Sequence, residues 1–400
     1  MIREFDVAEY NGSPIVIYGA GTFGGYALSA LKQHGLEPAC FCDRDKKGEQ
    51  YLGYDVYGYE HIGEIEDAAV LLAVGTALWE VADFLEGHNI TNLYYIYRFL
   101  FEDSRLNQEE FSDNARDIIY FRNLYRFAME KEQEDEVKLF TLDWVITEKC
   151  SLRCRDCSNL MQYYSTPQNY GKEDLQRNLD RVLEVAGRIF DVRVLGGEPF
   201  MNPYLPEIME KYLEDDRVIN FTIYTNGTIL PNERTLQALR NPKVKCQISN
   251  YGEIAKNFHA FVSLMEKEKL RYSVTEISAW QDLGKLEDRH KTEEEIAATF
   301  RLCECNNIIT LLDDKIYRCP FSAHGRNLEA IPDAEEDRVF LYGSVGYVRR
   351  KLRYLLKDKE FDYACGYCSG RNSNLTAIEP AVQSSRPLPY RKISALEGLG

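Results

Sequence analysis

Apolar runs separated by a glycine turn open the chain. Residues 15–18, IVIY, are followed by a glycine-rich turn, a helical stretch and a second apolar run that ends near Asp43. This order predicts strand, turn, helix and strand, the opening of a βαβ unit. Apolar runs in AAVLLAVG and NLYYIY, with a helix around LWEVADFLEGH between them, continue the alternation. The pattern predicts a small α/β domain over residues 1–100.

A second alternation follows a charged interval. Residues 101–138 are polar and charged, and NARDIIYFRNLYRFAMEKE predicts a helical connector. Five or six β/α units in order then favour a parallel barrel or a partial (β/α)6 barrel over residues 139–300, again of the α/β class. We expect short strands and loops over 301–372 and an extended tail over 373–400. The barrel strands are predicted in LFTLDWVITEKC, DVRVLGGEP, INFTIYTNG, VKCQISN and YSVTEI.

Length and charge narrow the class of protein. A chain of 400 residues exceeds what one core usually organises, which predicts two or three domains. A net charge of −16 and a pI of about 5.0 disfavour phosphate backbones and anionic lipids as partners. No window approaches the roughly 18 apolar residues of a membrane span, and the first residues hold no apolar signal segment. We therefore expect a cytoplasmic protein with no nucleic acid and no membrane as partner.

The eleven cysteines are grouped. A disulfide scaffold is improbable in a long chain without a secretory signal, so the grouping favours metal ligation. Cys150, Cys154 and Cys157 follow one predicted strand, and three thiolates can hold three irons of a 4Fe-4S cluster while leaving the fourth iron open to a ligand. A structural zinc ion would need a fourth protein ligand, and neither a cysteine nor a histidine lies close by in the sequence.

The C-x3-C-x2-C spacing after the first strand of a β/α run resembles the radical S-adenosylmethionine (SAM) superfamily. The resemblance implies that SAM chelates the open iron through its amino and carboxylate groups. It also implies that the ends of the following strands bind SAM. One residue departs from the family pattern: Asp156 stands where an aromatic residue usually packs near adenine. The implied SAM-binding residues are Gly196, Gly197, Glu198, Pro199, Thr225, Asn226, Ser249 and Asn250.

A second set of cysteines follows the predicted barrel. Its spacing resembles the auxiliary-cluster extension called SPASM, or twitch when it is shortened to one cluster, although Asp314 occupies the place of the usual glycine. Cys303 fits the spacing better than Cys305 does. A second 4Fe-4S cluster is implied, and a four-cysteine zinc site remains the alternative. The implied ligands are Cys303, Cys319, Cys365 and Cys368.

Gly19, Gly21 and Gly24 form G-x-G-x-x-G after the first strand, and Asp43 ends the next. Such a turn can hold a phosphate, and the acid can accept from a ribose hydroxyl. The predicted domain is too short to clasp a dinucleotide. It resembles the small Rossmann-like domains fused to sugar acyltransferases and other surface-polysaccharide enzymes, which are associated with nucleotide-activated sugars. A structural role, or formation of a homodimer, is the alternative.

Together these resemblances predict an enzyme that uses a 5′-deoxyadenosyl radical to dehydrate or oxidise a nucleotide-activated sugar or polyol, for example CDP-ribitol. A flavodoxin- or ferredoxin-type protein would donate electrons. Tyr251 and His324 are candidate catalytic residues by placement, with packing or hydrogen bonding as the alternative role. The rival functions are peptide modification of the SPASM type, a nicotinamide-dependent dehydrogenase, and a zinc-binding interaction protein.

Overall fold

The computed structural model describes residues 2–106, 118–134, 136–283, 285–372 and 375–393. Contacts between Cα atoms divide the chain into two compact units, Met1–Lys131 and Glu132–Gly400. Each unit is described by itself.

The first unit is built on a seven-stranded sheet in the order β1-β7-β6-β2-β3-β5-β4. All neighbouring strands are parallel except β4 and β5, which are antiparallel. The predicted strands and the helix after the glycine turn are confirmed. The strands are β1 (Arg3–Glu4), β2 (Ile15–Tyr18), β3 (Cys40–Cys42), β4 (Gln50–Tyr51), β5 (Tyr54–Tyr57), β6 (Ala69–Leu72) and β7 (Leu93–Tyr95), and the helices are α1 (Thr22–Gln33), α2 (Leu78–Gly87) and α3 (Tyr97–Phe101).

Helix α4 (Ile118–Met129) belongs to the first unit, whereas the sequence placed it in a connector over 101–138. The fully buried Tyr125 fixes it there. Its hydroxyl donates to the carbonyl oxygen of Leu72 at 2.8 Å and accepts from the backbone N–H of Ile96 at 3.2 Å. The part of the predicted connector over residues 107–117 lies outside the described residues.

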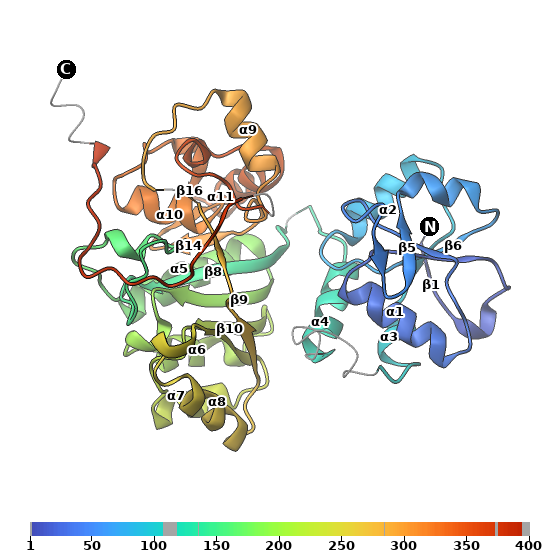
Figure 1. The fold of residues 1–400 in the computed structure, drawn as a ribbon, viewed down its shortest axis with the longest axis horizontal. Coiled ribbons are helices and arrows are strands. Elements are labelled where there is room, and N and C mark those ends of the chain that lie inside the picture. The colour runs from blue at the N-terminus through green and yellow to red at the C-terminus, as the bar shows by residue number, and fades with distance from the viewer. Residues whose placement is uncertain (1, 107–117, 135, 284, 373–374, 394–400) are drawn as a thin grey trace. The chain divides into compact units, whose positions relative to one another are not determined.

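The second unit is built on an eight-stranded sheet in the order β12-β11-β10-β9-β8-β14-β15-β16. Its first five strands are parallel, and helices connect them (Figure 1). The predicted partial barrel is thus present as an open sheet, because β12 and β16 are edges within the described residues. The strands are β8 (Leu139–Thr147), β9 (Ile189–Gly196), β10 (Val218–Thr225), β11 (Val244–Asn250) and β12 (Tyr272–Glu276), and the connecting helices are α5 (Lys172–Ala186), α6 (Leu205–Leu213), α7 (Glu233–Leu239) and α8 (Phe258–Lys267).

The chain after residue 300 extends the same sheet. Strand β14 (Thr310–Leu312) pairs with β8 in parallel, and it forms a hairpin with β15 (Lys315–Tyr317). Strand β16 (Arg338–Phe340) pairs with β15. The helices of this region are α9 (Glu293–Arg301), α10 (Pro320–Asn327) and α11 (Val345–Arg353).

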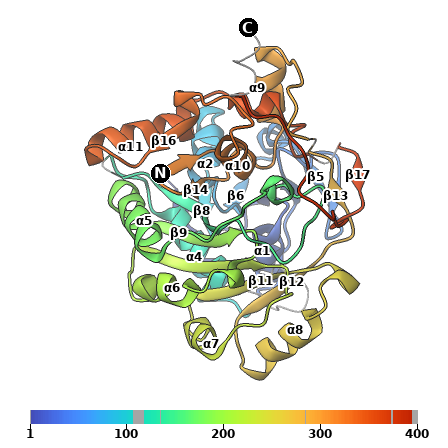
Figure 2. The same cartoon turned by 90° about the vertical axis from the view of Figure 1, so that its left-hand side faces the viewer.

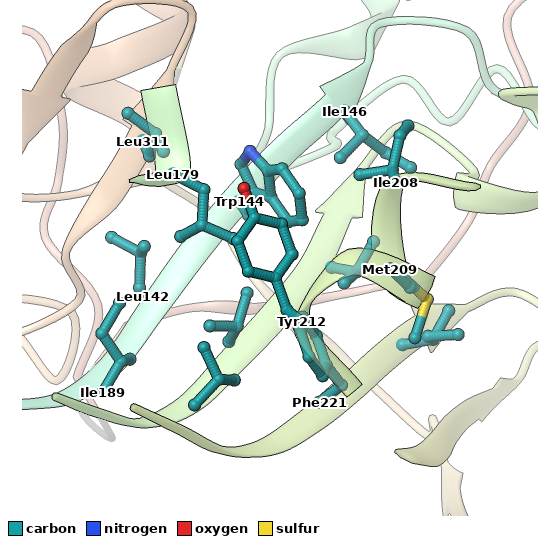
Figure 3. Close-up of a cluster of buried hydrophobic side chains, with 14 of the residues drawn as sticks. Leu142, Trp144, Ile146, Leu179, Ile189, Ile208, Met209, Tyr212, Phe221 and Leu311 are labelled. Atoms are coloured by element: carbon teal, nitrogen blue, oxygen red, sulfur yellow. The ribbon is translucent and has the colours of Figure 1, made fainter. Parts of the chain in front are cut away.

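The main core of the second unit lies between one face of the sheet and its helices. Successive residues of a strand point to opposite faces, so Leu142, Trp144 and Ile146 enter this core together. The ring of Trp144 meets that of Tyr212 edge to face, with centroids 6.0 Å apart, and both side chains are fully buried (Figure 3). The opposite face of β8–β12 therefore carries the alternate residues of each strand.

The described part of the predicted tail is ordered against the second unit. Strand β17 (Ala377–Ile378) pairs with β13 (Trp280–Gln281), and the two lie side by side in Figure 2. Further along, the backbone N–H of Ile393 donates to the carbonyl oxygen of Glu329 at 2.9 Å. Residues 373–374 and 394–400 of the predicted tail lie outside the described residues. In the described ranges, no helix has the length and apolar character needed to cross a membrane.

Candidate functional site

Cys150, Cys154 and Cys157 follow strand β8. The implied SAM-binding residues lie at the ends of β9, β10 and β11. These four strands are adjacent and parallel, so their carboxyl ends share one edge of the sheet. The structure thus brings together the segments that the sequence analysis singled out separately: 150–157, 196–199, 225–226 and 249–250.

Two glycines let the end of β9 touch the cysteine loop. Gly196 has φ +141°, and the backbone N–H of Gly197 donates to the carbonyl oxygen of Thr147 at 3.0 Å. The N–H of Glu198 donates to the carbonyl oxygen of Lys149 at 2.8 Å. A Cβ atom on Gly197 would lie 2.1 Å from that same Lys149 oxygen, closer than any side chain tolerates. The glycine pair therefore fixes the backbone just before Cys150.

Glu198 ties β9 to β10. Its fully buried carboxylate accepts the Thr225 hydroxyl and the backbone N–H of Asn226, each at 2.9 Å. It also accepts the backbone N–H of Phe200 at 3.3 Å. Burial raises the pKa of Glu198 to about 7, and these hydrogen bonds oppose the rise. The side chain organises the strand ends, while the role in SAM binding stays a prediction.

Asn226 reaches the cysteine loop from β10. Its side-chain N–H donates to the Ser151 hydroxyl at 3.1 Å and lies 3.6 Å from the sulfur of Cys150. Its side-chain oxygen accepts the backbone N–H of Thr228 at 3.0 Å, which fixes the orientation of the amide. Asn226 thus holds the start of the cysteine loop in place.

Cys150, Cys154 and Cys157 lie close enough to interact electrostatically. Burial, and then the neighbouring Cys157 sulfur, raise the pKa of Cys150 and raise that of Cys154 to about 11. Three sulfurs that resist losing their protons need a strong positive centre before they become thiolates together. Iron ions would supply that charge.

Across the described ranges, no three cysteine, histidine or carboxylate side chains converge on a point that one metal ion could occupy. The ligands of an iron-sulfur cluster bind different irons, so their sulfurs stand further apart than the ligands of one zinc ion. A 4Fe-4S cluster at each cysteine set stays a prediction, with zinc as the alternative at the second set.

The four predicted ligands of the second cluster also lie close enough to interact electrostatically. Each of Cys319, Cys365 and Cys368 has its pKa raised, by burial first and then partly by the Cys303 sulfur. Cys305 interacts with Cys303 and Cys319. Cys303 thus interacts with all three of the other predicted ligands, and its assignment as the fourth ligand stays a prediction.

Hydrogen bonds distinguish Cys303 from Cys305. The sulfur of Cys303 accepts the backbone N–H groups of Cys305 at 3.4 Å and Arg371 at 3.3 Å. The thiol of Cys305 and these N–H groups lower the pKa of Cys303. Two backbone N–H groups are therefore in place to stabilise a thiolate at Cys303.

Lys291 holds the turn between Cys365 and Cys368. Its ammonium group donates to the carbonyl oxygen of Cys365 at 3.0 Å and to that of Cys368 at 2.7 Å. It also donates to the Thr299 hydroxyl at 2.8 Å. Sequence reasoning missed this residue, because it lies more than seventy positions before the turn that it holds.

One apolar cluster touches both cysteine sets. We call it the shared apolar core. Cys157 packs against it from the first set, and Cys319 and Cys368 pack against it from the second. Its buried members are Leu160, Met161, Tyr163, Tyr164, Leu286, Phe321, Leu328, Ala330, Ile331 and Ala364.

The two candidate catalytic residues differ in their surroundings. His324 lies fully buried in α10, where its Nδ1 is 2.8 Å from the Tyr164 hydroxyl and burial lowers its pKa to about 3. Tyr251 stands edge to face with Trp280, with centroids 5.8 Å apart. Burial and then the Cys157 sulfur raise the pKa of Tyr251. Tyr251 thus borders the cysteine loop, whereas His324 is enclosed; a catalytic role for either stays a prediction.

Sequence reasoning also missed the face of β8–β12 that is opposite the main core. We call it the polar face. Asp143 on β8 forms an ion pair with Arg193 on β9, and Thr222 on β10 donates to both carboxylate oxygens of Asp191 at 3.0 and 2.9 Å. The signal was present, because polar residues alternate with the apolar ones in each strand. The polar face comprises Asp143, Asp191, Arg193, Thr222, Tyr224, Gln247, Ser273 and Thr275.

Close packing explains two of the glycines in the first unit. Gly19 has φ +116°, and a Cβ atom there would lie 2.4 Å from the carbonyl oxygen of Ala73 at the end of β6. A Cβ atom on Gly24 would lie 2.0 Å from the carbonyl oxygen of Gly19. These two residues let the first turn of α1 pack on the sheet, with or without a ligand.

Asp43 occupies the same turn. Its carboxylate accepts the backbone N–H of Ala20 at 2.9 Å and that of Asp45 at 2.9 Å. The Tyr51 hydroxyl donates to the carbonyl oxygen of Gly21 at 2.8 Å. The protein's own groups therefore satisfy much of this turn, and nucleotide binding by Gly19, Gly21, Gly24 and Asp43 stays a prediction.

Two relatives of known name are similar to part of this chain. A GTP 3',8-cyclase 1 of Mycobacterium tuberculosis is 33% identical over 91 residues, which are 21% of this chain and 25% of that protein. A probable GTP 3',8-cyclase of Methanococcus maripaludis is 29% identical over 113 residues, which are 28% of this chain and 36% of that protein. The match thus spans about a third or less of these relatives.

Part of this chain is similar to solved structures at low identity. That of anSMEcpe with bound AdoMet has a TM-score of 0.38 at 16% identity, covering 60% of this chain and 92% of that one. That of BtrN in complex with AdoMet and 2-DOIA has a TM-score of 0.35 at 17% identity, covering 63% of this chain and all of that one. The family model of the radical SAM superfamily matches residues 144–247. This chain therefore contains a radical SAM superfamily domain.

Proposed function

We propose that this chain is a radical SAM enzyme that acts on a nucleotide-activated sugar or polyol. One observation carries the proposal. The loop with Cys150, Cys154 and Cys157 is fixed at the carboxyl edge of the parallel strands by Gly197 and Asn226, and its three sulfurs interact with one another. That arrangement suits a cluster with one iron open to SAM.

A 4Fe-4S cluster with bound SAM supplies a 5′-deoxyadenosyl radical that removes a hydrogen atom from an unactivated C–H bond. The protein provides placement and exclusion of water. The glycine pair before Glu198 and the amide of Asn226 fix the loop, and the shared apolar core keeps water from its far side. Cys303, Cys319, Cys365 and Cys368 would hold a second cluster, which could return or remove an electron.

The polar face supports a hydroxyl-rich substrate. On β9, β10 and β11 its residues lie one to five positions before the motifs that end these strands, on the face opposite the main core. Gln247 donates to the Thr275 hydroxyl at 2.7 Å and accepts from Ser273 at 2.6 Å. Hydroxyl and amide groups of this kind can exchange their mutual hydrogen bonds for bonds to a sugar or polyol.

A vicinal diol would suit this chemistry. Loss of a hydrogen atom beside one hydroxyl allows the neighbouring hydroxyl to leave as water. Return of one electron and one proton then gives a deoxy-keto product, whereas removal of an electron and a proton without loss of water gives a ketone. CDP-ribitol is the specific candidate. A flavodoxin- or ferredoxin-type donor would reduce the first cluster.

The test is anaerobic incubation of the reconstituted chain with SAM, a reductant and a substrate panel, scored by release of 5′-deoxyadenosine. The panel contains CDP-ribitol, other nucleotide sugars and, because of the cyclase relatives, GTP. We expect stimulation by a nucleotide-activated sugar or polyol and none in a Cys154→Ser variant. Stimulation by a peptide alone, or by GTP alone, would overturn the substrate class. A chain without iron after reconstitution would overturn the proposal itself.

A further inference from the structure

The segment near the C-terminal end lies along the cysteine loop. Gln383 forms an isolated antiparallel bridge with Cys154. The N–H of Arg155 donates to the carbonyl oxygen of Val382 at 2.7 Å, and the N–H of Ser384 donates to that of Arg153 at 2.7 Å. In Figure 1 this segment is part of the dark red, extended chain that leads to the C-terminus. The loop is therefore held by backbone bonds from a distant part of the chain.

The amide of Gln383 is aimed at a sulfur. Its Oε1 accepts the backbone N–H of Arg153 at 2.8 Å. Its Nε2 donates to the carbonyl oxygen of Ala381 and lies 3.2 Å from the sulfur of Cys154. The opposite orientation of the amide would place N–H against N–H and oxygen against oxygen. The N–H group therefore faces the sulfur.

The backbone beside it is shaped for this contact. Ala381 has φ +54°, in the left-handed region that a side-chain-bearing residue seldom adopts, and it is almost fully buried. This turn brings Gln383 round to the loop. The strained backbone at Ala381, the bridge between Cys154 and Gln383 and the Gln383 amide together hold this segment against the cysteine loop.

We propose that Gln383 is a positioning residue for the cluster ligated by Cys154. It donates a hydrogen bond to the ligand sulfur and thereby raises the reduction potential of that cluster. The reason is electrostatic: an N–H group stabilises the sulfur most when the cluster has gained an electron. This inference rests on the proposed function, because it needs iron at Cys154.

The decisive variant is Gln383→Glu. It keeps an oxygen for the Arg153 N–H but presents a carboxylate oxygen, instead of an N–H group, to the sulfur. Gln383→Leu removes all three hydrogen bonds of the Gln383 amide. Ser385→Ala is the matched control, because it changes a side chain of the same segment and leaves the Gln383 amide in place.

The measurement is a redox titration followed by electron paramagnetic resonance, using the cluster signal that changes when SAM is added. We expect the ratio of reduced to oxidised cluster at a fixed potential to fall roughly three- to tenfold in Gln383→Leu and further in Gln383→Glu. Iron content and the Ser385→Ala titration should match those of the parent chain.

An unchanged titration in Gln383→Glu with full iron content would overturn the inference. If Gln383→Leu fails to hold iron, Gln383→Glu still decides, since it keeps the bond to the loop backbone. Absence of any SAM-responsive cluster in the parent chain would instead overturn the proposed function. The two failures are therefore distinguishable.

Discussion

The carboxylate of Glu198 accepts the backbone N–H of Asn226 at 2.9 Å, so that the turn after β9 is bound to the turn after β10. Asn226 in turn reaches the cysteine loop that follows β8. Three motifs that are far apart in sequence are thus joined by a short series of hydrogen bonds. A substitution of Glu198 should therefore disturb all three motifs.

We predict that the stability of the chain depends on the protonation of Glu198. Burial raises its pKa from 4.5 to about 7, so the folded state binds the proton more tightly than the unfolded state does. The contribution to the free energy of unfolding is fully present below about pH 4.5 and is lost as pH rises to about 7, on the order of 3 kcal/mol. Urea unfolding of the parent chain and of Glu198→Gln at pH 5 and pH 8 measures it. Equal pH dependence in both would contradict the prediction.

We predict that His324 gives the stability of the chain the opposite pH dependence. Burial lowers its pKa from 6.5 to about 3, so the folded state binds the proton less tightly than the unfolded state. Its contribution to stability is fully present above about pH 6.5 and falls by about 1.4 kcal/mol for each pH unit below that, down to about pH 3. NMR should show a His324 ring that does not titrate between pH 5 and 8. A His324 signal with a midpoint near 6.5 would show that this side chain is open to solvent.

Gly197→Ala should disrupt the cysteine loop. The added Cβ would lie 2.1 Å from the carbonyl oxygen of Lys149 and 3.0 Å from the Cβ of Cys150. Backbone must shift to make room, which we expect to cost about 3 kcal/mol and to reduce iron incorporation at the first cysteine set. Gly346→Ala in α11 is the control, because its added Cβ would lie 3.8 Å from the Arg350 guanidinium, an ordinary van der Waals contact. That variant should be neutral or more stable by about 0.5–1 kcal/mol. Equal iron content and stability in the two variants would refute this account of the glycine pair.

Cys303 and Cys305 can be separated by iron analysis. We predict that Cys303→Ser loses about half of the bound iron and sulfide, because one of two 4Fe-4S clusters would lose a ligand. Cys305→Ser should keep both, because the spacing assigns Cys303 and not Cys305 to the second cluster. Loss of iron from Cys305→Ser alone would reverse the assignment. Zinc in place of iron at this set would rule out its role in electron transfer.

The sequence predicted the elements that carry local signals. Strands β8 to β11 end on cysteine, glycine and asparagine motifs, and the hairpin β14–β15 is marked by a turn at Asp313, so both could be found from the pattern. Strands β1 and β4 could not be found, because two residues carry no periodicity. Helix α4 was predicted, but its attachment to the first unit depends on the distant contacts of Tyr125.

Contacts between remote segments were also beyond the sequence. The bridge between Cys154 and Gln383 is made by backbone groups, which leave no trace in residue types. Lys291 is an ordinary lysine until its three oxygen partners are seen. The polar face was different, because the alternation of polar and apolar residues can be seen in the sequences of β9 and β10. Only the structure shows that these polar residues share one face of the sheet.

Strand β14 limits where this chain can be cut or joined to another. It completes the sheet beside β8, the strand that leads into the cysteine loop. A chain cut at residue 300 would expose that edge of β8 to pairing with other chains. Chimeras between relatives should therefore be joined elsewhere than at residue 300, for instance in the interval near Lys131, where the two compact units meet in the sequence.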